Sequence, residues 1–161
     1  MKTAIACSLL CLVAASAFAQ SVRPPIQVYV WTAGPDLAGP DQKGREDSVN
    51  DLIKVLDGNR YRRTLAIAAE RESSEIQVEV IMRGSINTRG KYQPIDSLGT
   101  KSRSASNALT LFATLRSRDY RLDLSCSAGA DNMLWRRTAQ VCADKILEWT
   151  QANLGQVRPK K

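Results

Sequence analysis

Residues 76–81 read Ile-Gln-Val-Glu-Val-Ile, and this alternation of apolar and polar side chains decides the fold. Alternation with a period of two puts every second side chain on one face, so this stretch predicts a half-buried β-strand. The same alternation returns at residues 109–116 and 120–126 around a short polar turn, which predicts an antiparallel hairpin. Residues 26–31 and 65–69 complete the set of predicted strands.

Two other segments show the spacing of amphipathic helices. Residues 48–57 carry apolar side chains at i, i+3, i+4 and i+7, and we expect Ser48 to cap this helix and Gly58 to end it. The second helix is expected to run from a cap at Asp131 to about Asn153, with apolar positions spaced by four and three residues.

The order of elements, β-α-β-β-β-β-α, predicts an α+β domain. We expect a mixed, mostly antiparallel sheet of about five strands with two helices packed on one face. The opposite face would stay polar, with Phe112 as an apolar exception; its expected side chains are Thr110, Thr114, Arg116, Arg121, Asp123 and Ser125. Residues 83–107 are rich in Gly, Ser, Lys and Arg, which predicts a mobile loop or, alternatively, a hairpin tip entered by both flanking strands.

The amino terminus predicts export. An apolar run over residues 4–15 is too short to span a membrane as a helix, and residues 17–19 fit the Ala-x-Ala pattern of signal-peptide cleavage. We therefore expect cleavage near Ala19-Gln20 and a periplasmic or secreted protein without a transmembrane anchor. The bulky residue before Cys11 disfavours the alternative of lipid attachment there.

The domain expected after residues 1–19 are removed is a single α+β unit over residues 20–155, followed by a basic tail at 156–161. Cleavage lowers the formal net charge of +7 by one. For an exported basic protein, the expected partner is an envelope protein or an anionic surface, and nucleic acid is excluded by compartment. The alternative is a solvated basic surface that serves solubility. The candidate binding residues are Lys101, Arg103, Arg116, Arg118 and Arg121.

Two cysteines, Cys126 and Cys142, remain in the expected mature chain. Both point toward the predicted core, one from a strand end and one from the buried face of a helix. An oxidising compartment then favours a disulfide between them, with two buried thiols as the alternative.

The absence of histidine narrows the possible chemistry. It removes Ser-His-Asp and Cys-His mechanisms, and neither a P-loop nor a Gly-x-Gly-x-x-Gly motif is present, so no cofactor is expected. Asp36 and Asp41 are weak candidate ligands for a hard cation such as calcium, because turn formation and helix capping explain acidic residues there better. The prediction is a non-catalytic binding module; the competing hypothesis is a histidine-independent hydrolase or cation-binding protein that uses loop carboxylates.

These features together resemble a known kind of protein. The apolar leader, the Asp-Ser-x-x-x-Leu pattern at residues 47–52, the Ile-x-Val-x-Val strand and the amphipathic last helix resemble small uncharacterised exported bacterial proteins. The order of elements is similar to the α/β domains of envelope proteins such as the TolB amino-terminal domain and CsgG. The resemblance implies an envelope role and assigns no residue to a function.

Overall fold

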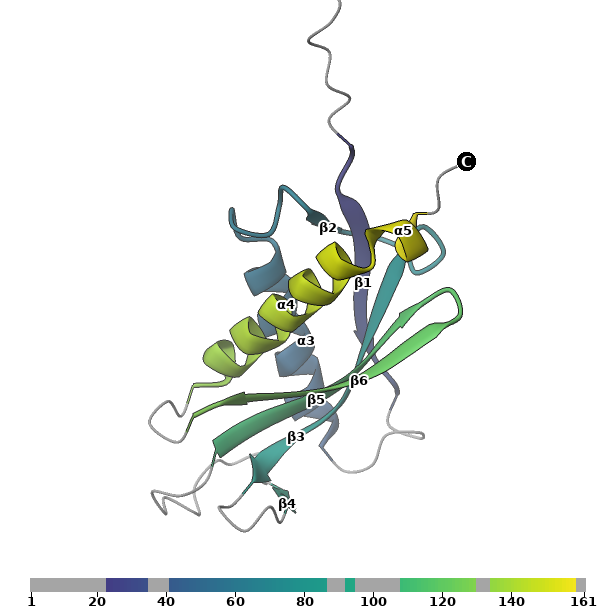
Figure 1. Ribbon diagram of the computed structural model, residues 1–161. Coiled ribbons are helices and arrows are strands. Elements are labelled where there is room, and N and C mark those ends of the chain that lie inside the picture. The colour runs from purple at the N-terminus through teal and green to yellow at the C-terminus, as the bar shows by residue number, and fades with distance from the viewer. Residues whose placement is uncertain (1–22, 35–40, 87–91, 95–107, 130–133, 159–161) are drawn as a thin grey trace, which may run out of the picture.

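A computed structural model describes residues 23–34, 41–86, 92–94, 108–129 and 134–158 (Figure 1). Its elements in chain order are β1 (Ile26–Thr32), α3 (Gln42–Leu56), β2 (Leu65–Ile67), β3 (Ile76–Ile86), β4 (Tyr92–Pro94), β5 (Ala108–Ser117), β6 (Tyr120–Ala128), α4 (Trp135–Ala152) and α5 (Leu154–Val157). The predicted signal peptide lies outside the described residues, as do Asp36, Lys101, Arg103 and Asp131.

The strands form one mixed sheet in the order β2-β1-β3-β5-β6, with the short β4 paired to β3 off this path. β1 is parallel to β2 and β3, whereas β3 is antiparallel to β4 and β5, and β5 to β6. The prediction of an α+β fold with a mixed, mostly antiparallel sheet is confirmed. The sequence patterns did not predict β4 or α5.

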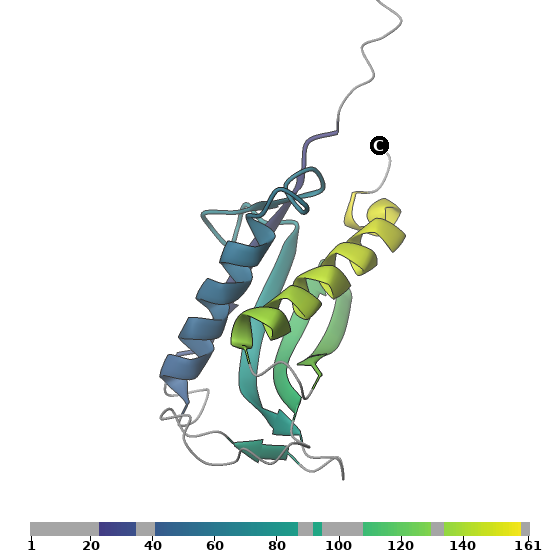
Figure 2. The same ribbon diagram turned by 90° about the vertical axis from the view of Figure 1, so that its left-hand side faces the viewer.

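Both long helices lie on the same side of the sheet and contact each other (Figure 2). The core between these layers contains Leu52 and Leu56 of α3 and Ile146 of α4, together with the inward-facing residues of β1, β3 and β5. Burial of each such aliphatic side chain contributes about 1.5–3 kcal/mol. Across the described part of the chain, no helix covers the other side of the sheet, which we call the open face.

A disulfide joins the two layers. Cys126 of β6 and Cys142 of α4 are bonded, with a Cα–Cα distance of 5.2 Å, and both are fully buried. The sequence prediction of this bridge is confirmed. The two cysteines are 16 positions apart in the sequence. A disulfide that closes a loop of this length should stabilise the fold by about 3 kcal/mol.

Helix α3 begins earlier than predicted. Asp41, not Ser48, caps it: the Asp41 carboxylate accepts a hydrogen bond from the Gly44 N–H at 3.2 Å. Ser48 lies inside the helix, where its hydroxyl donates to the Gly44 carbonyl at 2.9 Å. The apolar pattern does not indicate the first turn, because this turn is polar and contains a glycine, the residue least suited to helix interiors after proline.

The predicted loop at 83–107 also needs correction. Strand β3 continues through residues 83–86, with a register shift between Val80 and Met82 that marks a β-bulge. This agrees with the alternative in which a flanking strand extends into the segment; apart from β4, the remainder lies outside the described residues. Helix α4 begins at Trp135, with Leu134 as its N-cap residue and no side-chain cap, so the expected cap at Asp131 is wrong; the helix ends at Ala152, close to the expected Asn153. No described helix is long and apolar enough to cross a membrane.

Candidate functional site

Three of the predicted binding arginines gather at the turn end of the β5–β6 hairpin. Arg116 of β5 and Arg121 of β6 lie directly opposite each other in the strand register, and Arg118 follows in the two-residue turn. Strand alternation places Arg116 and Arg121 on the open face, because their neighbour Leu115 is in the core. The hairpin therefore concentrates positive charge that is only dispersed along the sequence.

Like charges that face each other across a strand pair are destabilising. Here each of the two facing arginines has a carboxylate partner that offsets this repulsion. Arg116 Nη2 lies 3.0 Å from Glu79 Oε2, and Arg121 Nε lies 3.4 Å from Asp123 Oδ1. A hydrogen bond from the Thr114 hydroxyl, and then the charge of Arg121, hold the pKa of Asp123 below its usual range. Arg116, Arg121 and Asp123 are exposed to solvent, so they remain available to a partner, whereas the Glu79 side chain is only 12% exposed.

Arg118 adopts a backbone conformation that is unusual for its residue type. Its φ angle is +51°, and it is the only non-glycine residue with positive φ in the described ranges. Tight two-residue hairpin turns require positive φ, a requirement usually met by glycine or asparagine. An L-residue such as arginine in this conformation costs about 1–2 kcal/mol. Backbone strain of this kind clusters at functional sites.

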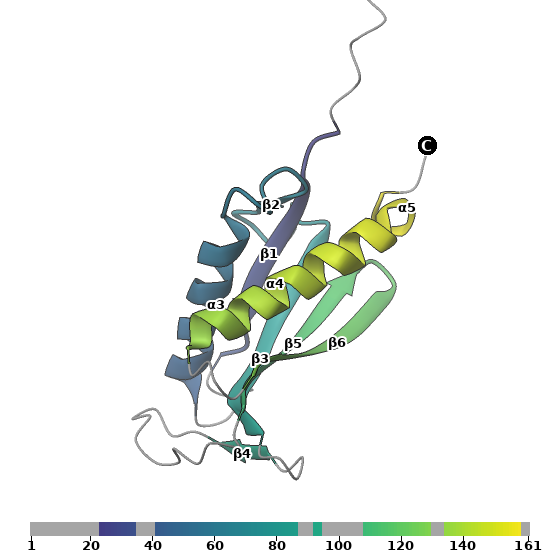
Figure 3. The ribbon, with the colours of Figure 1, turned by 60° about the vertical axis from the view of Figure 1, so that its left-hand side comes forward.

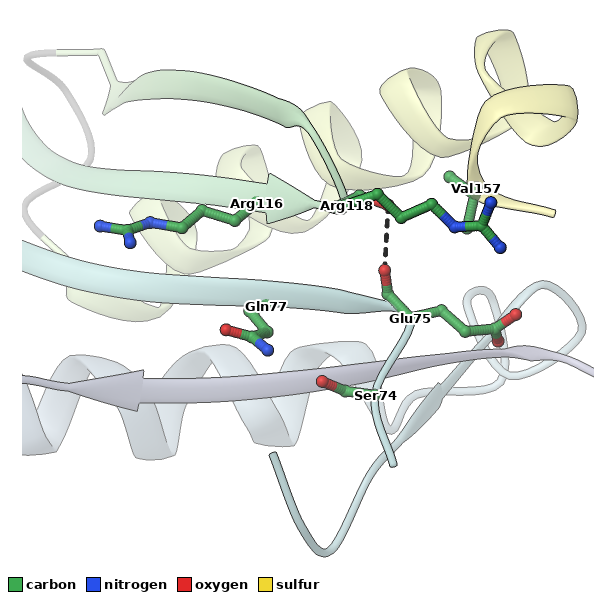
Figure 4. Close-up of a pocket in the computed structure, with 7 residues that line it drawn as sticks. Ser74, Glu75, Gln77, Arg116, Arg118 and Val157 are labelled. Atoms are coloured by element: carbon green, nitrogen blue, oxygen red, sulfur yellow. Dashed lines mark hydrogen bonds between the residues drawn. The ribbon is translucent and has the colours of Figure 1, made fainter. Parts of the chain in front are cut away.

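A hollow of about 410 Å³ lies beside this turn, where β3 begins. Figure 4 shows that the side chains of Arg116 and Arg118, which both line the hollow, extend in opposite directions, with Gln77 and Ser74 between them. The Ser117 hydroxyl donates to the Glu75 carbonyl at 3.0 Å and holds the turn against the start of β3. The lining is therefore rich in hydrogen-bond donors.

The one carboxylate in this lining belongs to Glu75, and its negative charge is balanced by the guanidinium of Arg158. Arg158 donates to both Glu75 oxygens, and the Gln27 N–H adds a hydrogen bond of 3.0 Å. Burial alone would raise the pKa of Glu75, but these donors outweigh it and the pKa lies below its usual value. Arg158 also binds the carbonyls of Pro24 at 2.6 Å and Pro25 at 3.0 Å, so the folded unit extends beyond residue 155.

The side chains of the open face are less exposed to solvent than predicted. Thr110 and Thr114 are buried, and their hydroxyls bond to the Ser127 hydroxyl and to Asp123. Towards β1, the Arg71 guanidinium lies 4.5 Å from the centre of the Trp31 ring. This side of the sheet thus combines arginine, hydroxyl and aromatic groups.

The candidate cation ligand Asp41 is occupied by protein groups. Its Oδ1 accepts the hydrogen bond from Gly44, and its Oδ2 lies 3.5 Å from Arg83 Nε. Arg83 in turn lies 3.9 Å from Asp47 and 4.9 Å from the centre of the Trp135 ring. The second candidate, Asp36, lies outside the described residues. Within the described ranges, no three acidic, cysteine or histidine residues form a group that could hold a metal ion.

A second hollow, of about 380 Å³, lies between α4 and the segment after α3. Its carboxylate, Asp144, accepts a hydrogen bond from the Tyr61 hydroxyl at 2.8 Å and pairs with Arg60 at 3.1 Å. Burial and then this hydrogen bond raise the pKa of Tyr61 to about 12. These contacts tie α4 to the segment after α3, and Asp41 lines neither hollow.

Sequence reasoning missed several residues of the hairpin site. The alternation in residues 76–81 places Gln77 on the face opposite Val78, but no local signal links Glu75 to Arg158, which is 83 residues away. Comparison with protein-family models finds no match for this chain, and comparison with curated proteins finds none either.

Proposed function

We propose that the protein is a non-catalytic binding module, exported to the bacterial envelope, that binds anionic oxygen groups of a partner at the hairpin site. The observation that carries this proposal is the arrangement of Arg116, Arg118 and Arg121 at one end of the β5–β6 hairpin. Arginine is suited to phosphate and carboxylate groups because its planar guanidinium donates two parallel hydrogen bonds.

The shape of the site favours an extended anionic partner. The guanidinium groups of Arg116 and Arg118 point away from each other, so each can bind a separate anionic group on a surface or chain (Figure 4). Between them, Ser74 and Gln77 supply uncharged polar groups. An array of lipid phosphates presents such a pattern, and each arginine near it should contribute about 1 kcal/mol.

Binding to vesicles tests the proposal. We expect the protein to sediment with vesicles of phosphatidylglycerol and phosphatidylcholine at low salt, but not with phosphatidylcholine alone, and to be released at high salt. Replacing Arg116 and Arg118 by Gln should weaken binding roughly thirtyfold. The control is Arg136→Gln with Arg137→Gln, which removes the same charge from exposed positions on α4. Equal weakening by both double variants would contradict a site at the hairpin.

A second arm separates the sources of the anionic group. Soluble polyglutamate that binds with the same dependence on Arg116 and Arg118, while vesicles do not bind, would assign the site to an acidic protein. If replacing Arg116 and Arg118 reduces binding neither to vesicles nor to polyglutamate, the proposal is wrong.

Export is tested separately. The Cys126–Cys142 bridge supports an oxidising compartment. We expect the protein recovered from an expressing bacterium to be in the periplasm or medium and, by mass spectrometry, to begin at Gln20. A cytoplasmic chain that retains residues 1–19 would contradict this part of the proposal.

A further inference from the structure

Strand β6 is an exposed edge of the sheet. It spans nine residues, Tyr120–Ala128, pairs with β5 on one side and has no second partner strand among the described residues (Figure 3). Edge strands present a row of backbone N–H and C=O groups that can pair with another chain. The side chains and backbone groups along β6 indicate which chain fits.

The direction of the backbone groups follows from two contacts. Lys145 Nζ of α4 donates to the Ser125 carbonyl at 2.6 Å, so this carbonyl points out of the sheet. In antiparallel strands the outward groups alternate, so Arg121 and Asp123 also direct their backbone groups outward. The turn agrees, because the pair that closes a two-residue hairpin, Ser117 and Tyr120, is hydrogen-bonded inward. Since Lys145 covers Ser125, the open part of the edge is residues 120–124.

This open part is self-complementary about Leu122. In an antiparallel pair of two copies centred on Leu122, Arg121 of each copy faces Asp123 of the other. Both residues carry outward backbone groups, so the register also forms hydrogen-bonded pairs. Centring the pair on residue 121 or 123 would instead place like charges opposite each other, which is destabilising.

The same register covers the exposed apolar side chains of β6. Tyr120 is 47% exposed and Leu122 is 36% exposed, and both lie on the helix side of the sheet. Leu122 would face Leu122 of the second copy, and Tyr120 would face Leu124. Apolar cross-strand pairs stabilise sheets. The Leu122–Leu122 and Tyr120–Leu124 pairs would be those without backbone hydrogen bonds, in which the facing side chains lie closest.

We propose that two copies of this chain associate through β6, antiparallel and centred on Leu122, into one continuous sheet. The two-fold axis is perpendicular to the sheet, so all four long helices lie on one side and both open faces lie on the other. The inference concerns the protein alone and does not rest on the proposed anion binding.

Charge exchange tests both the association and its register. We expect sedimentation equilibrium of the purified chain, from micromolar to millimolar, to show a monomer–dimer equilibrium. Arg121→Asp places two acidic residues opposite each other and Asp123→Arg places two arginines, so each should weaken the dimer roughly tenfold to a hundredfold. The double variant restores complementarity and should dimerise like the parent chain. An equimolar mixture of the two single variants should form a heterodimer.

Controls make each outcome decisive. Arg63→Asp reverses an exposed charge away from β6 and should leave the dimer unchanged. Leu122→Cys should give a disulfide-linked dimer on oxidation, whereas Tyr120→Cys should not, since Tyr120 faces Leu124 rather than itself. The crosslinking result stands even if a charge variant fails to fold. A chain that is monomeric throughout, or single variants that dimerise as well as the double variant, would overturn the inference.

Discussion

Lys145 donates a hydrogen bond of 2.6 Å to the backbone carbonyl of Ser125, so a side chain from α4 covers part of the edge of the sheet. Charged side chains at sheet edges are a common protection against unwanted strand pairing. Here the protection is partial, because it leaves residues 120–124 uncovered.

Replacing Lys145 with Ala should therefore increase self-association. The Ser125 carbonyl loses its donor, so a longer stretch of β6 can pair with another chain. Sedimentation velocity should show larger species at a given concentration, while thermal stability changes little because the hydrogen bond is exposed. Lys54→Ala removes the same charge from an exposed site on α3 and should have no effect. Unchanged sedimentation in both variants would show that Lys145 does not limit pairing.

A methyl group at Gly44 should destabilise the protein, although alanine favours helices. The added carbon would overlap Arg83 Nε and the Asp41 carboxylate, which close over Gly44. Loss of the Asp41 cap costs about 1 kcal/mol or more, which cancels the gain of about 1 kcal/mol in helix propensity, and displacement of Arg83 adds to the cost. Urea unfolding should place Gly44→Ala below the parent chain. Gly155→Ala has open space around it and should be neutral or stabilising; equal behaviour of the two variants would contradict the contact.

The stability of the protein should fall in acid partly through Glu75. Its folded pKa lies below the usual 4.5, so its contribution is present above that pH and is lost as pH falls through the folded value. Glu75→Gln should cost about 1–2 kcal/mol at neutral pH, because Arg158 loses its charged partner. Below pH 4.5, urea unfolding should show this difference shrinking. Glu72→Gln, at an exposed loop position, should show no difference at any pH.

Tyr61 should ionise only in strongly alkaline solution. Its pKa is raised to about 12 by burial and by Asp144, so it stabilises the fold below pH 10 and loses that effect as pH rises through 12. Absorbance at the tyrosinate band should show a late step that Tyr61→Phe removes. Asp144→Asn should move the step to lower pH. Circular dichroism at each pH confirms that the chain is folded where the step is measured.

Arg118→Gly should stabilise the fold and weaken anion binding together. Glycine relieves the positive φ angle, which should raise the free energy of unfolding by about 1 kcal/mol. Arg118→Ala removes the same charge but keeps the strain, so it should weaken vesicle binding without the gain in stability. Equal stability of the two variants would contradict the idea that Arg118 is strained.

The parts of the fold that the sequence predicts are those with local patterns. The alternation of apolar and polar residues predicts strands at residues 76–81, 109–116 and 120–126. The strand and helix patterns also predict that Cys126 and Cys142 both point into the core. The start of α3 was missed because a glycine in a polar turn does not indicate a helix. The Arg83 side chain, which packs against Gly44 together with the Asp41 carboxylate, comes 39 positions later in the sequence.

The candidate site also has a part that the sequence predicts and a part that it does not. Arg116, Arg118 and Arg121 were predicted because a short hairpin keeps sequence neighbours together. The ion pair of Glu75 with Arg158 and the contact of Lys145 with Ser125 join distant segments. Neither leaves a periodic signal, since each depends on how the last helix crosses the sheet.

The contact of Arg158 with Pro24 also bears on how this unit can be rearranged. A hydrogen bond of 2.6 Å joins residues near the two extremes of the described region. A short glycine-serine bridge between these positions should allow a circular permutant, with new ends opened at the exposed turn near Asn59. For the same reason, the whole unit could be inserted into a surface loop of a host protein, because it enters and leaves at neighbouring points.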